Sequence, residues 1–160
     1  MIKVSFKLPL DEKPKTVTTF NDRVVKVTLK GKLIIPVEIR DMMNLSIWKW
    51  MDNHPSVYSI FDMIIVDGIA KCSDTDTFNH ILGERIAEAR AKIKLYRFIS
   101  TLIEKIMKNT FKIMYGNMEL DVCRESHENP PLPCLLLEYR RYLALEVSEQ
   151  KHLNELIENS

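Results

Sequence analysis

Three oxygen-bearing side chains, those of Asp74, Asp76 and Asn79, have the types and spacing closest to a metal site in this sequence. Carboxylates and amides that alternate in this way open calcium-binding loops, because their oxygens converge on one cation. Such a loop also needs a glycine and a bidentate glutamate at fixed positions downstream, and this sequence has neither at those offsets. The segment therefore predicts the start of a helix, with Asp76 or Thr77 as its N-cap.

A second group, Cys123, His127 and Cys134, has the side chains of a zinc site and of a cysteine–histidine nucleophile pair. The spacing fits no common structural zinc site, and a fourth ligand would have to come from a distant part of the chain. The carboxylate of the nearby Glu125 disfavours a thiolate, which is the reactive form of cysteine. We therefore predict that the chain is not an enzyme and has no catalytic residue, metal or cofactor. Zinc-dependent stabilisation is kept as a third hypothesis.

Basic residues gather on one face of the long helix that is predicted for residues 77–116. Its apolar residues recur at spacings of three and four, which gives an amphipathic helix with lysines and arginines opposite the apolar stripe. Such a surface can neutralise phosphates and release counterions. The candidate nucleic-acid contacts are Arg90, Lys94, Arg97, Lys105 and Lys108. Because no nucleic-acid-binding motif accompanies them, nucleic-acid binding is the alternative function.

Residue types that are typical of protein interfaces occur in two other predicted helices. Trp48 and Trp50 lie on different faces of one helix, so at least one of them is expected to be partly exposed. If the C-terminal helix lies outside the core, its apolar stripe has to be covered by another protein or by a second copy. The candidate partner-binding residues are Trp48, Trp50, Tyr139, Arg140, Arg141 and Tyr142. Protein binding or self-association is therefore the first functional hypothesis.

The overall composition favours one soluble domain. The 160 residues are 46% hydrophobic, which suffices for a single core. The net charge of +1 gives no global attraction to nucleic acid or to an anionic membrane. We find no signal-peptide pattern and no apolar run near the roughly 20 residues of a transmembrane helix, which predicts an intracellular protein without membrane contact. The three cysteines are widely spaced, as is typical of reduced thiols.

Alternating apolar and polar residues predict an antiparallel sheet built from two hairpins. After an opening strand over 2–8, the first hairpin joins 23–29 to 32–39 through a turn at Lys30-Gly31. Pro36 cannot donate a hydrogen bond to a neighbouring strand, so it indicates an edge strand or a bulge.

The second predicted hairpin joins residues 57–66 to 69–72. Its turn is assigned to Asp67-Gly68, because both central residues of a type I′ turn require positive φ. Helical spacing predicts helices over 41–53, 77–116 and 134–157. The predicted fold class is α+β, with an antiparallel sheet of two hairpins packed on one long helix and an additional C-terminal helix. The predicted parts are an α+β core domain over 1–116, a polar Pro-rich connection over 117–133 and a C-terminal helix over 134–160.

The segment that starts at the second predicted turn also carries a resemblance. Its residues are Gly68, Ile69, Ala70, Lys71, Cys72, Asp74, Asp76, Phe78, Asn79, Gly83, Ile86, Ala87, Arg90 and Ala91. Together they resemble a segment of small, mostly uncharacterised proteins of tailed bacteriophages and related mobile elements. The resemblance implies a phage accessory protein with a hairpin packed on a helix, and it supplies no catalytic residues. We therefore expect a non-enzymatic viral protein that binds a virion component or occludes a host or defence factor during host takeover, either in the host cytoplasm or in the virion.

Overall fold

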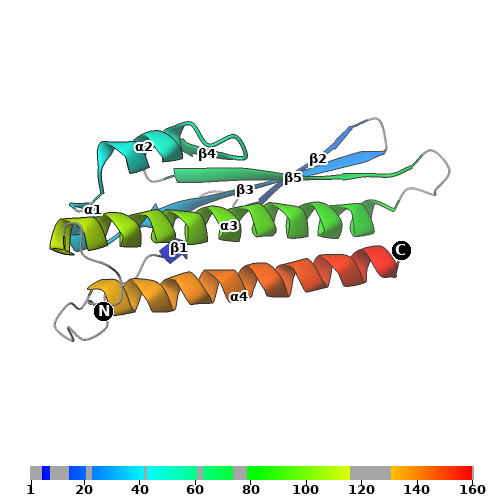
Figure 1. The fold of residues 1–160 in the computed structure, drawn as a ribbon. Helices are drawn as coiled ribbons and strands as arrows, with labels where there is room; N and C mark the ends of the chain where they lie inside the picture. Colours follow the sequence, from blue (N-terminus) through cyan, green and yellow to red (C-terminus); the bar gives the residue numbers. More distant parts are fainter. Residues whose placement is uncertain are drawn as a thin grey trace.

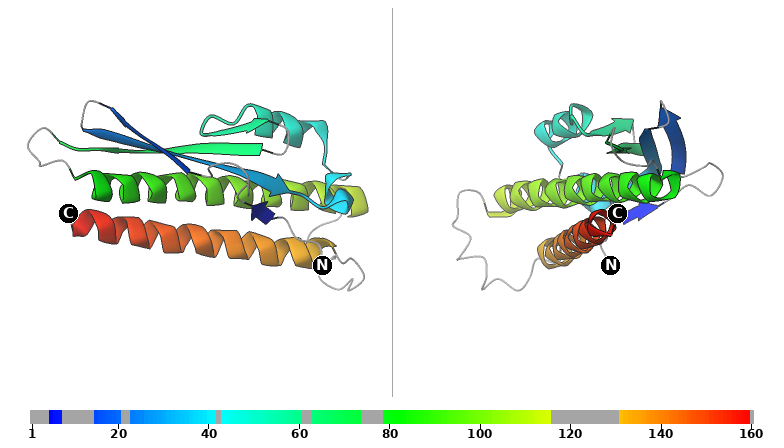
Figure 2. Two further views of the ribbon diagram at one scale, coloured as in Figure 1. Left: turned by 180° about the vertical axis from the view of Figure 1, so that it is seen from behind. Right: turned by 90° about the vertical axis from the view of Figure 1, so that its right-hand side faces the viewer.

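The computed structural model describes residues 5–7, 15–20, 23–41, 43–60, 63–73, 79–115 and 131–159. The elements follow in the order β1 (Ser5–Lys7), β2 (Lys15–Phe20), β3 (Val24–Ile34), α1 (Val37–Arg40), α2 (Leu45–Asp52), β4 (Val57–Ile60), β5 (Met63–Lys71), α3 (His80–Tyr115) and α4 (Pro131–Glu158). They form three layers, because α3 lies along one face of the sheet and α4 lies along the far side of α3 (Figures 1 and 2). The predicted α+β class, antiparallel sheet and long helix are confirmed.

The central strand of the sheet is β3. It pairs with β1 and β2 along one edge and with β5 along the other, and β5 carries β4 on its far side. Each of these pairings is antiparallel. The ladder between β4 and β5 ends at the pair of Val57 and Val66, whereas the ladder between β3 and β5 continues to Lys71. Among the described strands, residues 67–71 of β5 therefore have a neighbour on one side only.

Both predicted hairpin turns are wrong. Lys30-Gly31 lies inside β3, and Asp67-Gly68 lies inside β5. In β3 the alternation of buried residues continues through Gly31, so the strand extends where the sequence suggested a turn. Pro36 lies beyond the end of β3 and precedes α1, so it belongs neither to an edge strand nor to a bulge. Strand β4 ends at Ile60, and its antiparallel neighbour β5 begins at Met63, before the predicted second turn.

Gly68 meets a requirement of packing and not of a turn. A Cβ atom at this position would overlap the carbonyl oxygen of Ala87 and lie 2.6 Å from the backbone nitrogen of Ala91. Both atoms belong to the backbone of α3, which cannot rotate away as a flexible side chain could. Glycine is therefore the residue that lets β5 approach α3 this closely.

Helices α2 and α3 begin at side-chain caps. The Oδ1 atom of Asn44 accepts a hydrogen bond of 2.9 Å from the backbone nitrogen of Ile47 at the start of α2. The Oδ1 atom of Asn79 accepts hydrogen bonds of 3.1 and 3.2 Å from the nitrogens of Ile81 and Leu82 in α3. Each cap satisfies a backbone donor that has no partner within its helix. The predicted caps Asp76 and Thr77 lie outside the described residues.

Two helix boundaries differ from the prediction. Helix α2 covers most of the predicted helix 41–53, whereas the short helix α1 begins inside the segment 32–39, which was predicted as a strand. The C-terminal helix α4 begins at Pro131, earlier than the predicted position 134. Proline is tolerated in the first turn of a helix, because the backbone donors there have no intrahelical partner. Most of the predicted Pro-rich connection lies outside the described residues.

The main core lies between the sheet and α3 and extends to α4. Strand β3 directs Val25, Val27 and Leu29 inward, and β5 directs Ile64 and Val66 inward. Their partners on the helices include Phe98, Ile99, Leu102, Ile103, Ile106, Leu135 and Tyr142. The start of α4 is thus part of the core. None of the described helices is long and apolar enough to cross a membrane.

Candidate binding groove

A groove lies where the far end of β5, the first half of α3 and the second half of α4 meet. Its volume is about 290 Å³. Its lining residues are Ile69, Arg90, Ile93, Lys94, Arg97, Gln150 and Leu153. Ile93 and Leu153 are buried and form an apolar floor, and Ile69 is 41% exposed. We call this site the β5–α3–α4 groove.

The groove contains three of the five basic residues that the sequence placed on one face of the long helix. Positions 90, 94, 97, 105 and 108 are separated by multiples of three or four residues or by combinations of them, so they share one face of α3. Arg90, Lys94 and Arg97 line the groove. Lys105 and Lys108 lie further along the same face.

Arg90 and Lys94 bind the backbone of β5. The Nη1 atom of Arg90 donates a hydrogen bond of 2.7 Å to the carbonyl oxygen of Ile69, and the Nζ atom of Lys94 donates one of 2.8 Å to that of Asp67. Both carbonyls belong to the part of β5 that extends beyond β4. Neither cation pairs with a carboxylate of the described residues, so their positive charges are not neutralised within this part of the chain.

The other basic residues of this face have partners that reduce their availability. The Nε atom of Arg97 lies 2.8 Å from the Oε1 atom of Glu146 in α4. The Nζ atom of Lys108 lies 3.0 Å from a carboxylate oxygen of Glu104, one helical turn earlier. Lys105 places its Nζ atom 5.3 Å from the ring centroid of Trp50, a cation–π contact. The structure thus brings the five residues onto one face, and their charges are available to different extents.

An apolar row on α4 continues from the groove. Leu136, Leu143 and Val147 precede Gln150 at spacings that place all four side chains on one face of the helix. The side chain of Val147 is 69% exposed, and Leu136 and Leu143 are exposed as well. Gln150 itself lines the groove. The described residues thus leave this apolar row uncovered beside the cationic side chains of α3.

The two tryptophans pack against the core on the side of α3 that faces away from α4. The ring of Trp50 stacks on that of Phe98 at a centroid distance of 5.0 Å, and His54 contacts both rings edge-on. Burial lowers the pKa of His54 below its usual value. Trp48 is also half-buried against the core. Helix α2, which carries both tryptophans, is separated from α4 by α3 (Figure 1).

The candidate contacts on α4 divide in the same way. Tyr142 is only 2% exposed, so this residue packs in the core and its ring is not available to contact a partner. Arg141 donates a hydrogen bond of 3.1 Å to the Oη atom of Tyr142 and lies 3.5 Å from a carboxylate oxygen of Glu138. Tyr139 is half-buried against the core, and Arg140 is exposed. The structure therefore does not bring the six predicted partner-binding residues together.

The predicted metal ligands are only partly described. Cys123, His127, Asp74 and Asp76 lie outside the described residues. Cys134 lies near the start of α4 and is half-buried. The part of the chain that the structure describes contains no group of three histidine, cysteine, aspartate or glutamate side chains that could hold a metal ion.

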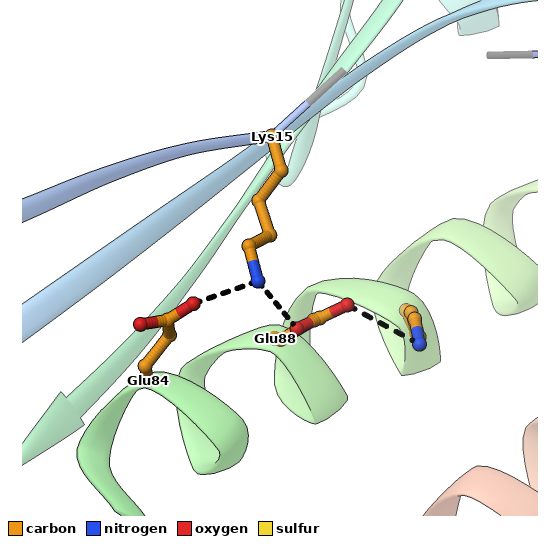
Figure 3. Close-up of polar contacts among 4 residues, drawn as sticks. Lys15, Glu84 and Glu88 are labelled. Atoms are coloured by element: carbon orange, nitrogen blue, oxygen red, sulfur yellow. Dashed lines mark hydrogen bonds and ion pairs between the residues drawn. The ribbon is translucent and has the colours of Figure 1, made fainter. Parts of the chain in front are cut away.

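A second cationic contact lies beneath β2, on the other flank of α3. The Nζ atom of Lys15 lies 2.7 Å from a carboxylate oxygen of Glu84 and 3.1 Å from one of Glu88 (Figure 3). Glu88 also lies 3.4 Å from the Nζ atom of Lys92. These charges are balanced within the chain, in contrast to those of Arg90 and Lys94.

Sequence reasoning found the basic residues of the groove and missed the acceptors. Asp67 and Ile69 were assigned to a turn and to the strand after it, so no exposed strand edge was expected at these residues. Gln150 and Leu153 carried no signal beyond their place in a helix. The molecule is an α+β protein with a sheet and two long helices in three layers. Comparisons with models of protein families, with curated proteins and with solved structures found no match to this chain.

Proposed function

We propose that this chain is a non-enzymatic protein that binds another protein through the apolar row of α4 and the adjoining β5–α3–α4 groove. The observation that carries the proposal is the row of Leu136, Leu143 and Val147, which is exposed beside cations without carboxylate partners among the described residues. The partner that fits is a protein surface with apolar side chains bordered by carboxylates. In keeping with the resemblance to phage proteins, the partner would be a virion component or a host factor.

A partner that covers the apolar row would gain binding free energy in proportion to the apolar area that it buries. Burial of apolar surface contributes about 25 cal/mol for each Å² removed from water. Carboxylates of the partner next to the apolar contact would supply the negative charge that Arg90 and Lys94 lack as partners among the described residues. Complementary charge also steers the encounter and excludes partners with a basic surface.

Nucleic-acid binding is the alternative, because five basic residues share one face of α3. A phosphate backbone would have to compete with Glu146 for Arg97 and with Glu104 for Lys108. It would also leave the apolar row of α4 exposed. These contacts favour a protein partner over nucleic acid.

The test is an affinity purification of the tagged chain from a host lysate, with and without nuclease and at two salt concentrations. A V147E variant places a charge in the apolar row. V37E is the matched control, because Val37 is 66% exposed and lies on α1. We expect the wild-type chain to recover a discrete protein whether or not nuclease is added. The V37E variant should recover the same protein, and the V147E variant should not.

Two other results contradict the proposal. One is recovery of nucleic acid that nuclease removes and that falls steeply with salt, which would support the alternative. The other is capture of the same proteins, or of none, by the wild-type chain and both variants. Circular dichroism of each variant confirms that the fold is intact before the comparison is made.

A further inference from the structure

The edge of β5 beyond β4 combines backbone hydrogen-bonding groups with two cations. We propose that an extended peptide segment bearing carboxylate side chains binds as an added strand along residues 67–71 of β5, with its carboxylates at Arg90 and Lys94. This inference rests on the proposed function and specifies which part of the partner enters the groove.

The backbone geometry of β5 leaves this edge open among the described strands. The last residue of β5 that pairs with β4 is Val66, and residues 67–71 pair with β3 alone. The carbonyls of Asp67 and Ile69 accept hydrogen bonds from side chains of α3, so they point away from β3. A residue of an antiparallel strand directs its N–H and its C=O to the same side. The edge therefore offers both the donors and the acceptors that an added strand needs.

The cations at this edge determine the chemistry of the occupant. Arg90 and Lys94 now donate to two neutral carbonyls, which an incoming strand would bind with its own N–H groups. The released guanidinium and ammonium groups could then bind carboxylates, and an ion pair adds an attraction between opposite charges that a bond to a neutral carbonyl lacks. Exchange of one acceptor for the other favours an acidic segment over a basic one.

The groove provides space for the side chains of such a strand. Its volume of about 290 Å³ lies between Ile69 on β5 and Gln150 on α4. Alternate side chains of a strand point to opposite faces of the sheet. One set would face α3, where Arg90 and Lys94 lie above the apolar floor of the groove, and the other set would lie beside Ile69.

Charged side chains also protect sheet edges against unwanted pairing. If Arg90 and Lys94 served only this purpose, they would keep the carbonyls of Ile69 and Asp67 occupied, and neither an acidic nor a basic strand would bind. The two roles differ in what they predict for a short acidic peptide, and this difference defines the experiment.

The probe is a fluorescent short peptide of alternating valine and glutamate, and its binding is followed by fluorescence anisotropy. The control peptide has lysine in place of glutamate. We expect the lysine peptide to bind at least about tenfold more weakly than the glutamate peptide. A tenfold change in affinity corresponds to about 1.4 kcal/mol, which is about the contribution of one hydrogen bond to a charged group. The protein variant R90E/K94E should reverse the preference and bind the lysine peptide more tightly.

Backbone methylation separates strand addition from simple charge attraction. A strand presents only alternate amides to its neighbour. We therefore expect N-methylation of one alternate set of amides in the valine–glutamate peptide to abolish binding, and methylation of the other set to leave it. On the protein, the amides of Asp67 and Ile69 should exchange their hydrogens more slowly when the peptide is bound, a measurement that needs no variant.

The inference is overturned if the two peptides bind equally, if neither binds, or if both methylated sets behave alike. The V147E variant separates this outcome from failure of the proposed function. If V147E fails to capture the protein and the wild-type chain does not bind the acidic peptide, the proposed strand-binding site is wrong, but protein binding by α4 is supported. If the peptide binds but capture does not depend on Val147, the role of the apolar row is wrong.

Discussion

The two flanks of α3 carry cations in different surroundings. Beneath β2, Lys15 lies within 3.1 Å of carboxylate oxygens of both Glu84 and Glu88 (Figure 3). At the edge of β5, Arg90 and Lys94 bind backbone carbonyls, without a carboxylate partner among the described residues. The first flank holds β2 to α3, whereas the second presents positive charge beside a groove.

The pKa values on the first flank reflect its internal balance. Hydrogen bonds to Glu84 and Glu88 raise the pKa of Lys15 above its usual value. Burial would raise the pKa of Glu88, but its hydrogen bond from Lys15 and the charge of Lys92 outweigh burial and lower it. Charges that already form ion pairs within the chain attract a charged partner only weakly. The difference shows which cations around α3 serve the fold and which are available for binding.

The largest expected effect comes from Gly68, where β5 crosses α3 between the two flanks. The substitution G68A should lower the free energy of unfolding by about 3 kcal/mol, because its Cβ would displace the backbone of α3. The shift would separate Asp67 and Ile69 from Lys94 and Arg90, so the cationic edge would lose its geometry as well. Urea denaturation of the variant and the wild-type chain measures the loss.

Lys71 provides the control for this measurement. It is an exposed residue of the same strand, and K71A should change the free energy of unfolding by no more than about 0.5 kcal/mol. Equal stabilities of G68A and K71A would show that β5 does not approach α3 as closely as the structure indicates.

The next effect compares the two flanks directly. K15M should cost about 1 kcal/mol, because it leaves Glu84 and Glu88 without their shared cation, one helical turn apart. R90M should cost about half as much or less, because water can replace the guanidinium at an exposed carbonyl. Urea denaturation at low and high salt checks both values. Salt should reduce only the cost of K15M, since only that substitution removes an ion pair.

A double-mutant cycle of K15M with E88Q isolates the contact itself. A coupling free energy near zero, or equal costs of K15M and R90M, would remove the distinction between a flank that stabilises and a flank that binds.

The sequence predicted the basic residues at the edge of β5 better than it predicted their partners. Spacing alone places Arg90, Lys94 and Arg97 on one helix face, because the periodicity of a helix is local. Their acceptors are backbone carbonyls, which have no residue identity to detect. Among the described strands, the edge of β5 is open because the β4–β5 ladder ends at Val66, a boundary set by tertiary pairing.

Gly68 shows why the strands were assigned correctly in type and incorrectly in extent. Asp67-Gly68 has the composition of a type I′ turn, and the same glycine also suits a close approach of two backbones. A choice between these roles needs the position of α3, which begins well after β5 in the chain. By contrast, the buried alternation of Val25, Val27 and Leu29 follows from local periodicity, and this prediction is confirmed.

The smallest expected effect is a pH dependence that belongs to one flank only. The pKa of Lys15 is raised above 10.5, so its contribution is complete below that pH and is lost as the pH rises through the folded-state pKa. The pKa of Glu88 is lowered below 4.5, so its contribution is present above that pH and is lost as the pH falls through the folded-state pKa.

The cost of K15M should therefore be constant between these limits and decrease on either side of them. The cost of R90M should not change as the pH falls below 4.5, because the carbonyl of Ile69 does not titrate. Urea denaturation of the wild-type chain and both variants, from neutral pH to below 4.5, measures the two costs. A parallel decrease for both variants would mean that Arg90 also depends on a carboxylate, and the edge of β5 would then lack the unbalanced charge on which binding of an acidic strand depends.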